Sequence, residues 1–198
     1  MNREKITGVV LAGGKNSRMG SDKGMLTVDG KKIIERILNA MKPVVDEIII
    51  ISNSCNYDQM GYKVYRDIIK DCGPMGGIFT ALNYSNTDKI LVISCDMPFI
   101  SVSILTSIIE SSNKGDIVIP DHSGGKLEPL CAVYSKSCLV TFVQLLSVGD
   151  WKIKDSLKHF SVRRIEFQDN QSPEHHFLNV NTPSEYQSIK QVNHEYSN

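Results

Sequence analysis

Apolar and polar positions along the chain alternate between two patterns. Short apolar runs, such as the four consecutive isoleucines at 48–51, predict buried strands. Between these runs, apolar residues recur every three or four positions, as Ile33, Ile37 and Met41 do, which predicts amphipathic helices. Strands are expected over residues 6–11, 47–52, 62–66, 89–94, 116–120, 128–134 and 162–167, and helices over residues 33–41, 78–83, 102–109, 136–146, 152–159 and 183–192.

The order strand, helix, strand in the first half predicts βαβ units and therefore a parallel sheet covered by helices. We expect an α/β fold of one domain, residues 1–198, with a Rossmann-like, mostly parallel sheet and helices on both faces. The alternating character of 162–167 is also typical of an antiparallel edge strand. Residues 72–77 are expected to be loop, and 121–126 a hairpin or loop. Residues 182–185, Thr-Pro-Ser-Glu, form a capping box that predicts the start of the last helix.

Composition narrows the function classes. Lys+Arg and Asp+Glu are balanced at 22 each, so no global field attracts nucleic acid or an anionic membrane, and neither is expected as a partner. No apolar run reaches about 18 residues, so no membrane span is expected, and the polar start leaves no room for a signal peptide. The five cysteines form no C-x-x-C pair, which predicts reduced thiols in a cytoplasmic protein and neither a disulfide framework nor a zinc site.

Residues 11–23, LAGGKNSRMGSDK, follow the first predicted strand and include three glycines. Adjacent glycines disfavour a helix and let the backbone come close to a ligand. The amide groups of such a loop can converge on an anion, and Lys15, Arg18 and Lys23 add positive charge. The spacing fits neither G-x-x-x-x-G-K-[ST] nor G-x-G-x-x-G. The sequence therefore predicts a phosphate site of another kind.

The pattern L-A-G-G-x-x-S-R-M-G-x-D-K resembles the signature loop of nucleotidyltransferases that transfer NMP from an NTP to a phosphate-bearing acceptor. Together with the strings at 73–78, 95–100 and 179–183, it is most similar to the molybdenum cofactor guanylyltransferases. The resemblance implies a fold of the nucleotide-diphospho-sugar transferase type, in which the N-terminal half binds GTP and the C-terminal half binds molybdopterin. It also implies Mg²⁺ as a cofactor, and cofactor-delivery proteins or acceptor molybdoenzymes as partners. The similarity is thin over residues 121–171.

Asp96 follows the strongly apolar run 89–94. Open α/β sheets bind ligands in the crevice at the carboxyl ends of their strands, so Asp96 is expected beside the predicted phosphate loop. Mg²⁺ binds few protein carboxylates and keeps water and phosphate oxygens, which makes Asp96 the expected metal ligand. The alternative is a turn aspartate ahead of Pro98.

Two further pairs of residues are assigned by the resemblance. Asn53 closes the second strand and Asp67 follows the third, where the family contacts the nucleotide, and a carboxylate suits the N–H donors of guanine. Asn179 and Asn181 belong to the family's N-x-N-T-P string, and on an extended segment they point to the same side. Their amides can donate to and accept from a pterin. For each pair, the alternative is a turn residue without a ligand.

Nucleotidyl transfer requires positioning and charge neutralisation more than covalent chemistry, and an acceptor phosphate is already ionised, so no general base is required. Backbone amides of residues 12–14 are expected to contact phosphate. The expected catalytic residues are Arg18, Lys23 and Asp96; the nucleotide-binding residues are Leu11, Ala12, Gly13, Gly14, Lys23, Asn53, Asp67 and Asp96; the acceptor-binding residues are Arg18, Asn179 and Asn181; and the metal ligand is Asp96.

Two other functions stay open. A sister enzyme would use CTP on the same cofactor or another NTP on a sugar phosphate, although those cytidylyl relatives tend to carry Ala-Ala-Gly where this chain has Leu-Ala-Gly-Gly. A nucleotide-binding regulatory module that no longer turns over would not need Lys23 and Asp96. A glycosyltransferase would have Asp-x-Asp at its metal, and Asp96-Met97-Pro98 lacks the second acid.

Overall fold

The structure is a computed structural model that describes residues 4–13, 22–113, 115–122, 124–167 and 173–195. Gly14 and Arg18, which the sequence assigns to the functional loop, lie outside the described residues, as do Lys15, Ser17, Met19 and Gly20.

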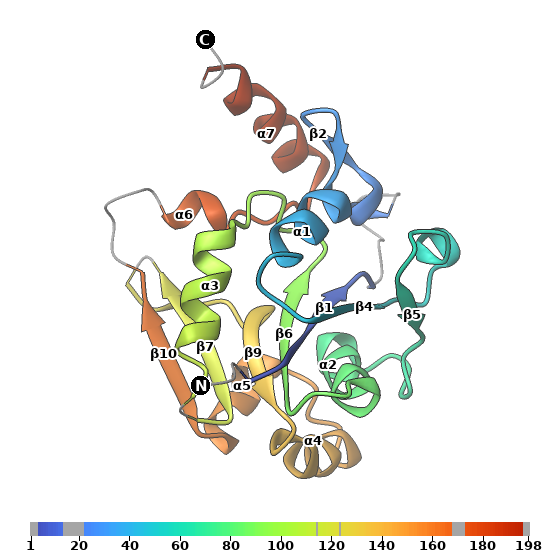
Figure 1. Ribbon diagram of the computed structural model, residues 1–198, viewed down its shortest axis with the longest axis vertical. Coiled ribbons are helices and arrows are strands. Elements are labelled where there is room, and N and C mark those ends of the chain that lie inside the picture. The colour runs from blue at the N-terminus through green and yellow to red at the C-terminus, as the bar shows by residue number, and fades with distance from the viewer. Residues whose placement is uncertain (1–3, 14–21, 114, 123, 168–172, 196–198) are drawn as a thin grey trace.

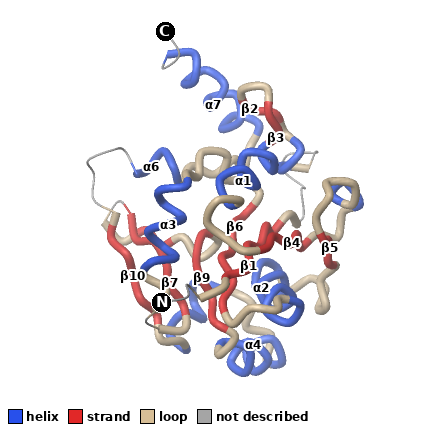
Figure 2. Tube along the Cα trace, in the orientation of Figure 1, coloured by secondary structure: helices blue, strands red, loops and turns tan. Residues whose placement is uncertain are grey.

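An eight-stranded sheet forms the centre of the molecule, with the strand order β10-β7-β9-β6-β1-β4-β5 and with β8 paired to β7 (Figure 1, Figure 2). Its strands are β1 (Ile6–Leu11), β4 (Glu47–Ile51), β5 (Lys63–Tyr65), β6 (Lys89–Ser94), β7 (Ile117–His122), β8 (Lys126–Leu127), β9 (Cys131–Ser135) and β10 (Val162–Glu166). Pairing is parallel from β6 through β1 and β4 to β5, whereas β9 runs antiparallel between β6 and β7. The predicted mostly parallel α/β sheet is therefore confirmed.

Helices cover both faces of this sheet, because successive strand residues point to opposite sides. Val10 belongs to an apolar cluster with α1 and α3, whereas Val9 belongs to a second cluster with α2 and α4. The helical segments are η1 (Lys23–Met25), α1 (Ile33–Met41), η2 (Cys55–Tyr57), α2 (Gly73–Tyr84), α3 (Val102–Glu110), α4 (Cys138–Ser147), α5 (Ile153–Ser156), η3 (Leu157–His159), α6 (Pro173–His176) and α7 (Pro183–Glu195); a small hairpin joins β2 (Thr27–Val28) to β3 (Lys31–Lys32).

The edge strand β10 runs parallel to β7, so the antiparallel direction suggested by its alternating pattern is wrong. The preceding strand β9 runs antiparallel to β6 and β7, and α4, α5 and η3 then lead the chain to the start of β10. There the Ser161 carbonyl oxygen accepts from Asp116 N at 2.8 Å, so β10 and β7 begin side by side. A half-exposed edge strand alternates apolar and polar residues whether it runs parallel or antiparallel to its neighbour. The sequence therefore could not decide the direction of β10.

Helix α2 begins at Gly73, five residues earlier than the sequence predicted. Pro74 lies in the first turn, where its missing N–H costs no hydrogen bond. Gly76 and Gly77 lie inside the helix because neighbouring atoms approach their backbone. A Cβ on Gly76 would lie 2.9 Å from the Ile69 carbonyl oxygen, and one on Gly77 would lie 3.1 Å from Leu11 Cδ2. Tertiary packing therefore overrides the weak helix propensity of glycine here.

We expect Gly76→Ala to destabilise the protein by about 1 kcal/mol, because overpacking costs about 1–3 kcal/mol and alanine in a helix returns about 1 kcal/mol. The neighbouring Gly77→Ala is the matched control, since its new methyl group meets a side chain that can move and not a backbone oxygen. Urea unfolding of both variants measures the difference. A Gly76→Ala protein at least as stable as Gly77→Ala would contradict the expectation.

Two local predictions are confirmed by hydrogen bonds and pairing. In the capping box, Thr182 N donates to Glu185 Oε2 at 2.9 Å, and Glu185 N donates to Thr182 Oγ1 at 3.2 Å. The predicted hairpin at 121–126 is the antiparallel pair β7–β8. Helix α6 was not predicted: its four residues are too few to show a helical period.

All five cysteines are free, and all but Cys55 are buried. Across the described ranges, no helix is both long and apolar enough to cross a membrane.

Candidate active site

The predicted phosphate loop leaves β1 at the edge of the sheet where its parallel neighbours also end. Leu11 is a buried core residue. Ala12 N donates to the Ile51 carbonyl oxygen at 2.9 Å, and the Ala12 carbonyl oxygen accepts from Ser52 Oγ at 2.5 Å. This amide is used within the sheet in this structure, and the expected contact of Ala12 with phosphate stays a prediction. Gly13 is exposed, and no described atom lies within 4 Å of the position that a Cβ would take.

Lys23, Asp96 and Asn181 meet at this edge, although they come from three distant parts of the chain. Lys23 Nζ donates to Asn181 Oδ1 at 2.6 Å and lies 3.5 Å from Asp96 Oδ2. The Lys23 and Asp96 side chains are only 20% and 16% exposed, so their attraction is less screened than that of a surface pair. Val180 N donates to the Asp96 carbonyl oxygen at 2.9 Å, which fastens the segment that carries Asn181 to the end of β6.

Two buried oxygen atoms on the segments that carry Asp96 and Asn181 lack hydrogen-bond partners among the described residues: Asp96 Oδ1 and Asn179 Oδ1. Buried polar atoms are paired in most proteins, and an unpaired one in a native fold calls for a missing ligand, ion or water. Both atoms lie on the segments that converge at Lys23. Asp96 Oδ1 is therefore an acceptor in place at the site for a donor or a cation that the described residues do not supply, and Asn179 Oδ1 is a second such acceptor two residues before Asn181.

Asp22 orients Lys23, a role that the sequence alone did not assign. Its carboxylate accepts from the Tyr57 hydroxyl, from Asn56 Nδ2 at 3.2 Å and from Gly24 N at 3.3 Å, and so caps η1. A Cβ on Gly24 would lie 2.6 Å from the Tyr57 hydroxyl oxygen, so only glycine fits there without a shift. Burial, Cys95 and Asp22 all raise the pKa of Tyr57, which keeps its hydroxyl protonated as a donor. The available sequence signal was a single tyrosine within the polar stretch 53–58.

Asn53 and Asp67 are paired with each other. Asn53 Nδ2 donates to Asp67 Oδ2 at 2.8 Å, and Asp67 N donates to Asn53 Oδ1 at 3.1 Å. Burial raises the pKa of Asp67, and the bond from Asn53 partly opposes this shift. Arg66 braces the same loop by donating to the Ser52 carbonyl oxygen at 2.7 Å and to Asp58. The structure thus places both residues together at the ends of β4 and β5.

Cys95 is not a nucleophile in this structure. It lies next to Asp96, but burial, with Asp96 and Asp22 nearby, raises the pKa of its thiol to about 12. The thiolate, which is the reactive form, is therefore scarce near neutral pH.

At the described part of this site, the Asp96 carboxylate is the group available to a metal ion. Within the ranges that the structure describes, no three His, Cys, Asp or Glu side chains lie close enough together to hold an ion. Mg²⁺ nevertheless fits Asp96, because it often takes one or two carboxylates and completes its shell with water and phosphate oxygens. The buried, unpartnered Asp96 Oδ1 is the atom that would contact it.

A mostly parallel α/β sheet with a glycine loop, a lysine and a carboxylate at the ends of its parallel strands is typical of enzymes of the nucleotidyltransferase class. The family described as "MobA-like NTP transferase domain" matches residues 8–162, and the chain belongs to this family.

Individual relatives agree with this assignment. The chain is 32% identical over 192 residues to a probable molybdenum cofactor guanylyltransferase of Carboxydothermus hydrogenoformans, an alignment that covers 96% of this chain and 97% of that protein. Among solved structures, molybdopterin-guanine dinucleotide biosynthesis protein A from Archaeoglobus fulgidus has a TM-score of 0.78 at 24% identity, covering 96% and 99% of the two chains. A CMP:2-keto-3-deoxy-manno-octonic acid synthetase complexed with CTP has a TM-score of 0.76 at 13% identity, covering 97% and 99%. The similarity to these two structures supports the fold alone.

Proposed function

We propose that the protein transfers GMP from GTP to the terminal phosphate of molybdopterin, forming molybdopterin guanine dinucleotide and releasing pyrophosphate. The observation that carries the proposal is the convergence of Lys23, Asp96 and Asn181 at the edge where the glycine loop begins. Membership of the MobA-like family and the names of its relatives support the choice of substrates.

The reaction joins two anions and expels a third. An oxygen of the acceptor phosphate attacks the α-phosphorus of GTP in line, a new P–O bond forms, and the bond to the pyrophosphate oxygen breaks. Lys23 places a cation against the phosphates, and Asn181 holds its Nζ in position. Mg²⁺, held by Asp96 and phosphate oxygens, would neutralise charge on the leaving pyrophosphate. We assign Gly13 and Gly14 to phosphate contacts through their backbone, and Arg18 to the acceptor phosphate.

Guanine recognition is assigned to Asn53 and Asp67. The N1–H and N2–H₂ groups of guanine are donors, and the Asp67 carboxylate is an acceptor that Asn53 holds in place through its Oδ2. Burial raises the pKa of Asp67, and this pKa would fall when GTP binds, because the guanine donors favour the charged carboxylate.

The acceptor is assigned to Asn179 and Asn181. Asn179 Oδ1 is buried without a described partner, and a pterin carries N–H donors that it can accept. Asn181 links this subsite to Lys23, so a pterin held by the two amides would place its phosphate near the nucleotide.

The setting follows from the same proposal. The protein would work in the cytoplasm, in keeping with five free thiols, and cofactor-delivery proteins or acceptor molybdoenzymes would be its protein partners. A balance of 22 basic and 22 acidic residues offers no global attraction for nucleic acid or membrane.

The test combines nucleotide binding with acceptor choice. Calorimetry with GTP, CTP, UTP and ATP in Mg²⁺ should show GTP bound most tightly, because the other bases leave the guanine acceptors unpaired at about 1–3 kcal/mol. Pyrophosphate should then be released with GTP and molybdopterin, and not with a sugar 1-phosphate.

Preference for CTP would instead assign the chain to the cytidylyl sister enzymes. Release with a sugar 1-phosphate and none with molybdopterin would overturn the acceptor. Tight GTP binding without release from any acceptor would indicate the regulatory module.

A further inference from the structure

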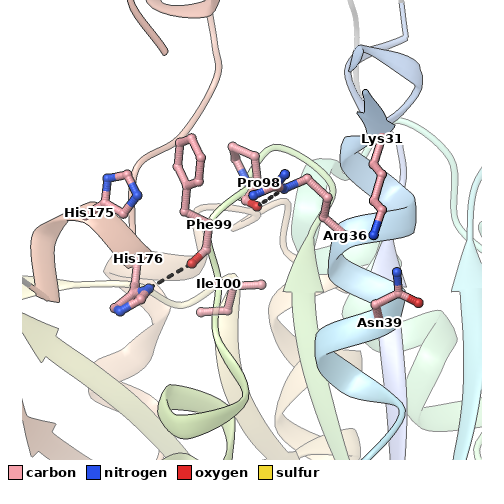
Figure 3. Close-up of a pocket in the computed structure, with 8 residues that line it drawn as sticks. All are labelled: Lys31, Arg36, Asn39, Pro98, Phe99, Ile100, His175 and His176. Atoms are coloured by element: carbon pink, nitrogen blue, oxygen red, sulfur yellow. Dashed lines mark hydrogen bonds between the residues drawn. The ribbon is translucent and has the colours of Figure 1, made fainter. Parts of the chain in front are cut away.

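The segment 176–180 is fastened at both ends to the chain that follows β6. His176 Nδ1 donates to the Phe99 carbonyl oxygen at 2.8 Å, in the wall of a pocket that both residues line (Figure 3). At the other end, Val180 N donates to the Asp96 carbonyl oxygen at 2.9 Å. The three residues between these two bonds depend on other contacts for their placement.

An aromatic stack holds the middle of this segment. Phe177 is 1% exposed, and its ring is stacked on the His122 imidazole, with centroids 4.5 Å apart and planes inclined by 13°. The Phe167 ring meets Phe177 edge-on, with centroids 5.7 Å apart. His122 is the last residue of β7, so the stack is a contact through which the sheet supports the segment two residues before Asn179.

A buried carboxylate sets the orientation of His122. His122 Nε2 lies 3.1 Å from Glu128 Oε1, and the two side chains are only 3% and 8% exposed. A carboxylate only accepts hydrogen bonds, so Nε2 is the donor. The exposed Lys126 places its Nζ 3.6 Å from the same Glu128 oxygen. The imidazole therefore has a fixed plane on which the Phe177 ring can stack.

A second connection runs from Glu128 back to β6. Ser94 N donates to the Leu130 carbonyl oxygen at 2.8 Å, so the turn after Glu128 is attached to the end of the strand that leads to the candidate site. The segment that carries Asn179 is therefore linked to this strand end in two ways. One is the direct bond from Val180 N, and the other passes through the buried histidine and glutamate.

Packing alone does not account for a polar pair in this part of the core. The desolvation cost of a buried carboxylate can exceed the attraction of its partners, and apolar side chains of similar volume are often at least as stabilising. What the pair of His122 and Glu128 supplies beyond packing is direction. Its hydrogen bond orients the imidazole, and the stacked geometry of flat rings passes this orientation to Phe177.

We propose that His122 and Glu128 are positioning residues of the acceptor subsite. Their hydrogen bond fixes the ring on which Phe177 is stacked, and the stack keeps Asn179 in the orientation in which its buried Oδ1 accepts from the pterin. The identity of the acceptor rests on the proposed function, whereas the support of Asn179 by the pair rests on the contacts alone.

The transfer assay tests the effect on the acceptor. Glu128→Leu should raise the KM for molybdopterin about tenfold, because His122 Nε2 loses its hydrogen-bond acceptor, and should leave the KM for GTP unchanged. Glu128→Gln keeps an acceptor oxygen at the same place and should retain the wild-type KM for molybdopterin. The matched control is Glu110→Leu, the same substitution at an exposed position at the end of α3, which should change neither KM. A wild-type KM for molybdopterin in Glu128→Leu would overturn the proposal.

A double variant separates positioning from stability. His122→Leu combined with Glu128→Leu fills the space with apolar side chains, so the free energy of unfolding in urea should be close to that of the wild type or larger. The KM for molybdopterin should nevertheless stay raised about tenfold, because Phe177 has lost the oriented ring on which it stacks. A KM that recovers together with the stability would mean that the pair only stabilises the fold, and would overturn the positioning role.

A further measurement needs no acceptor. In ¹H–¹⁵N spectra of the full chain, the side-chain amide signal of Asn179 should shift in Glu128→Leu and keep its wild-type position in Glu128→Gln and in the Glu110→Leu control. An unchanged Asn179 signal in Glu128→Leu would overturn the support of Asn179 by the pair. Absence of transfer from any acceptor would instead refute the proposed function, while the Asn179 signal still decides on the pair.

Discussion

Replacing Asp96 with asparagine should lower the rate of nucleotidyl transfer by about 10²–10³-fold, with little loss of GTP affinity. Asparagine keeps the shape of the side chain, and the bond from Val180 N goes to the Asp96 backbone, so the segment should stay in place. The substitution removes the negative charge that would hold Mg²⁺ at Oδ1. It also frees Lys23 from its ion pair, so GTP measured without metal should bind at least as tightly as to the wild type.

Steady-state kinetics and metal-free calorimetry together check this expectation. Asp88→Asn is the matched control, because Asp88 is an exposed aspartate just before the other end of β6 and loses the same charge. A wild-type rate in Asp96→Asn would refute the metal role. A loss of metal-free GTP affinity as large as the loss of rate would mean that Asp96 supports binding in general.

Lys23→Ala should lower kcat/KM for GTP by about 100-fold, with both a higher KM and a lower kcat. Truncating one partner of a partly buried charge pair costs about 2–5 kcal/mol, and here the Asp96 carboxylate would also face the incoming phosphates without its lysine. Asn181 Oδ1 loses its donor as well, so molybdopterin binding should weaken.

The control is Lys42→Ala, an exposed lysine at the end of α1 that makes the same change of net charge. Thermal unfolding of both variants separates a loss of function from a loss of fold. If Lys23→Ala keeps wild-type kinetics, the glycine loop is structural and the assignment of the site is wrong.

The sheet could be predicted from the sequence because its central strands are buried on both faces and contain continuous apolar runs. β1, β4 and β6 begin and end within a residue of the predicted ranges, and α1 matches residues 33–41. The direction of β10 and the start of α2 could not be predicted. The direction of β10 depends on where α4, α5 and η3 bring the chain back to the sheet after β9. The start of α2 depends on tertiary packing, in which the carbonyl oxygen of Ile69 approaches Gly76.

The candidate site was predicted in part. The types of residue were readable, since a glycine-rich loop after a buried strand and an aspartate at the end of another are typical of phosphate and metal sites. The partner that each polar atom binds could not be predicted from the sequence. The Ala12 amide was expected to contact phosphate, yet it donates to Ile51, because β1 continues its pairing with β4 by one residue.

By itself, the sequence determined the chemical groups of this protein and the strands that carry them, because burial and backbone propensity act over a few neighbouring residues. Only the tertiary structure decided which groups meet. Lys23, Asp96 and Asn181 are brought together by the order of the strands and by the bond from Val180 N to Asp96. The support of Lys23 by Asp22 and Tyr57 likewise depends on contacts between distant segments. Such contacts leave no local pattern, because the energy that forms them comes from the packing of the whole sheet and its helices.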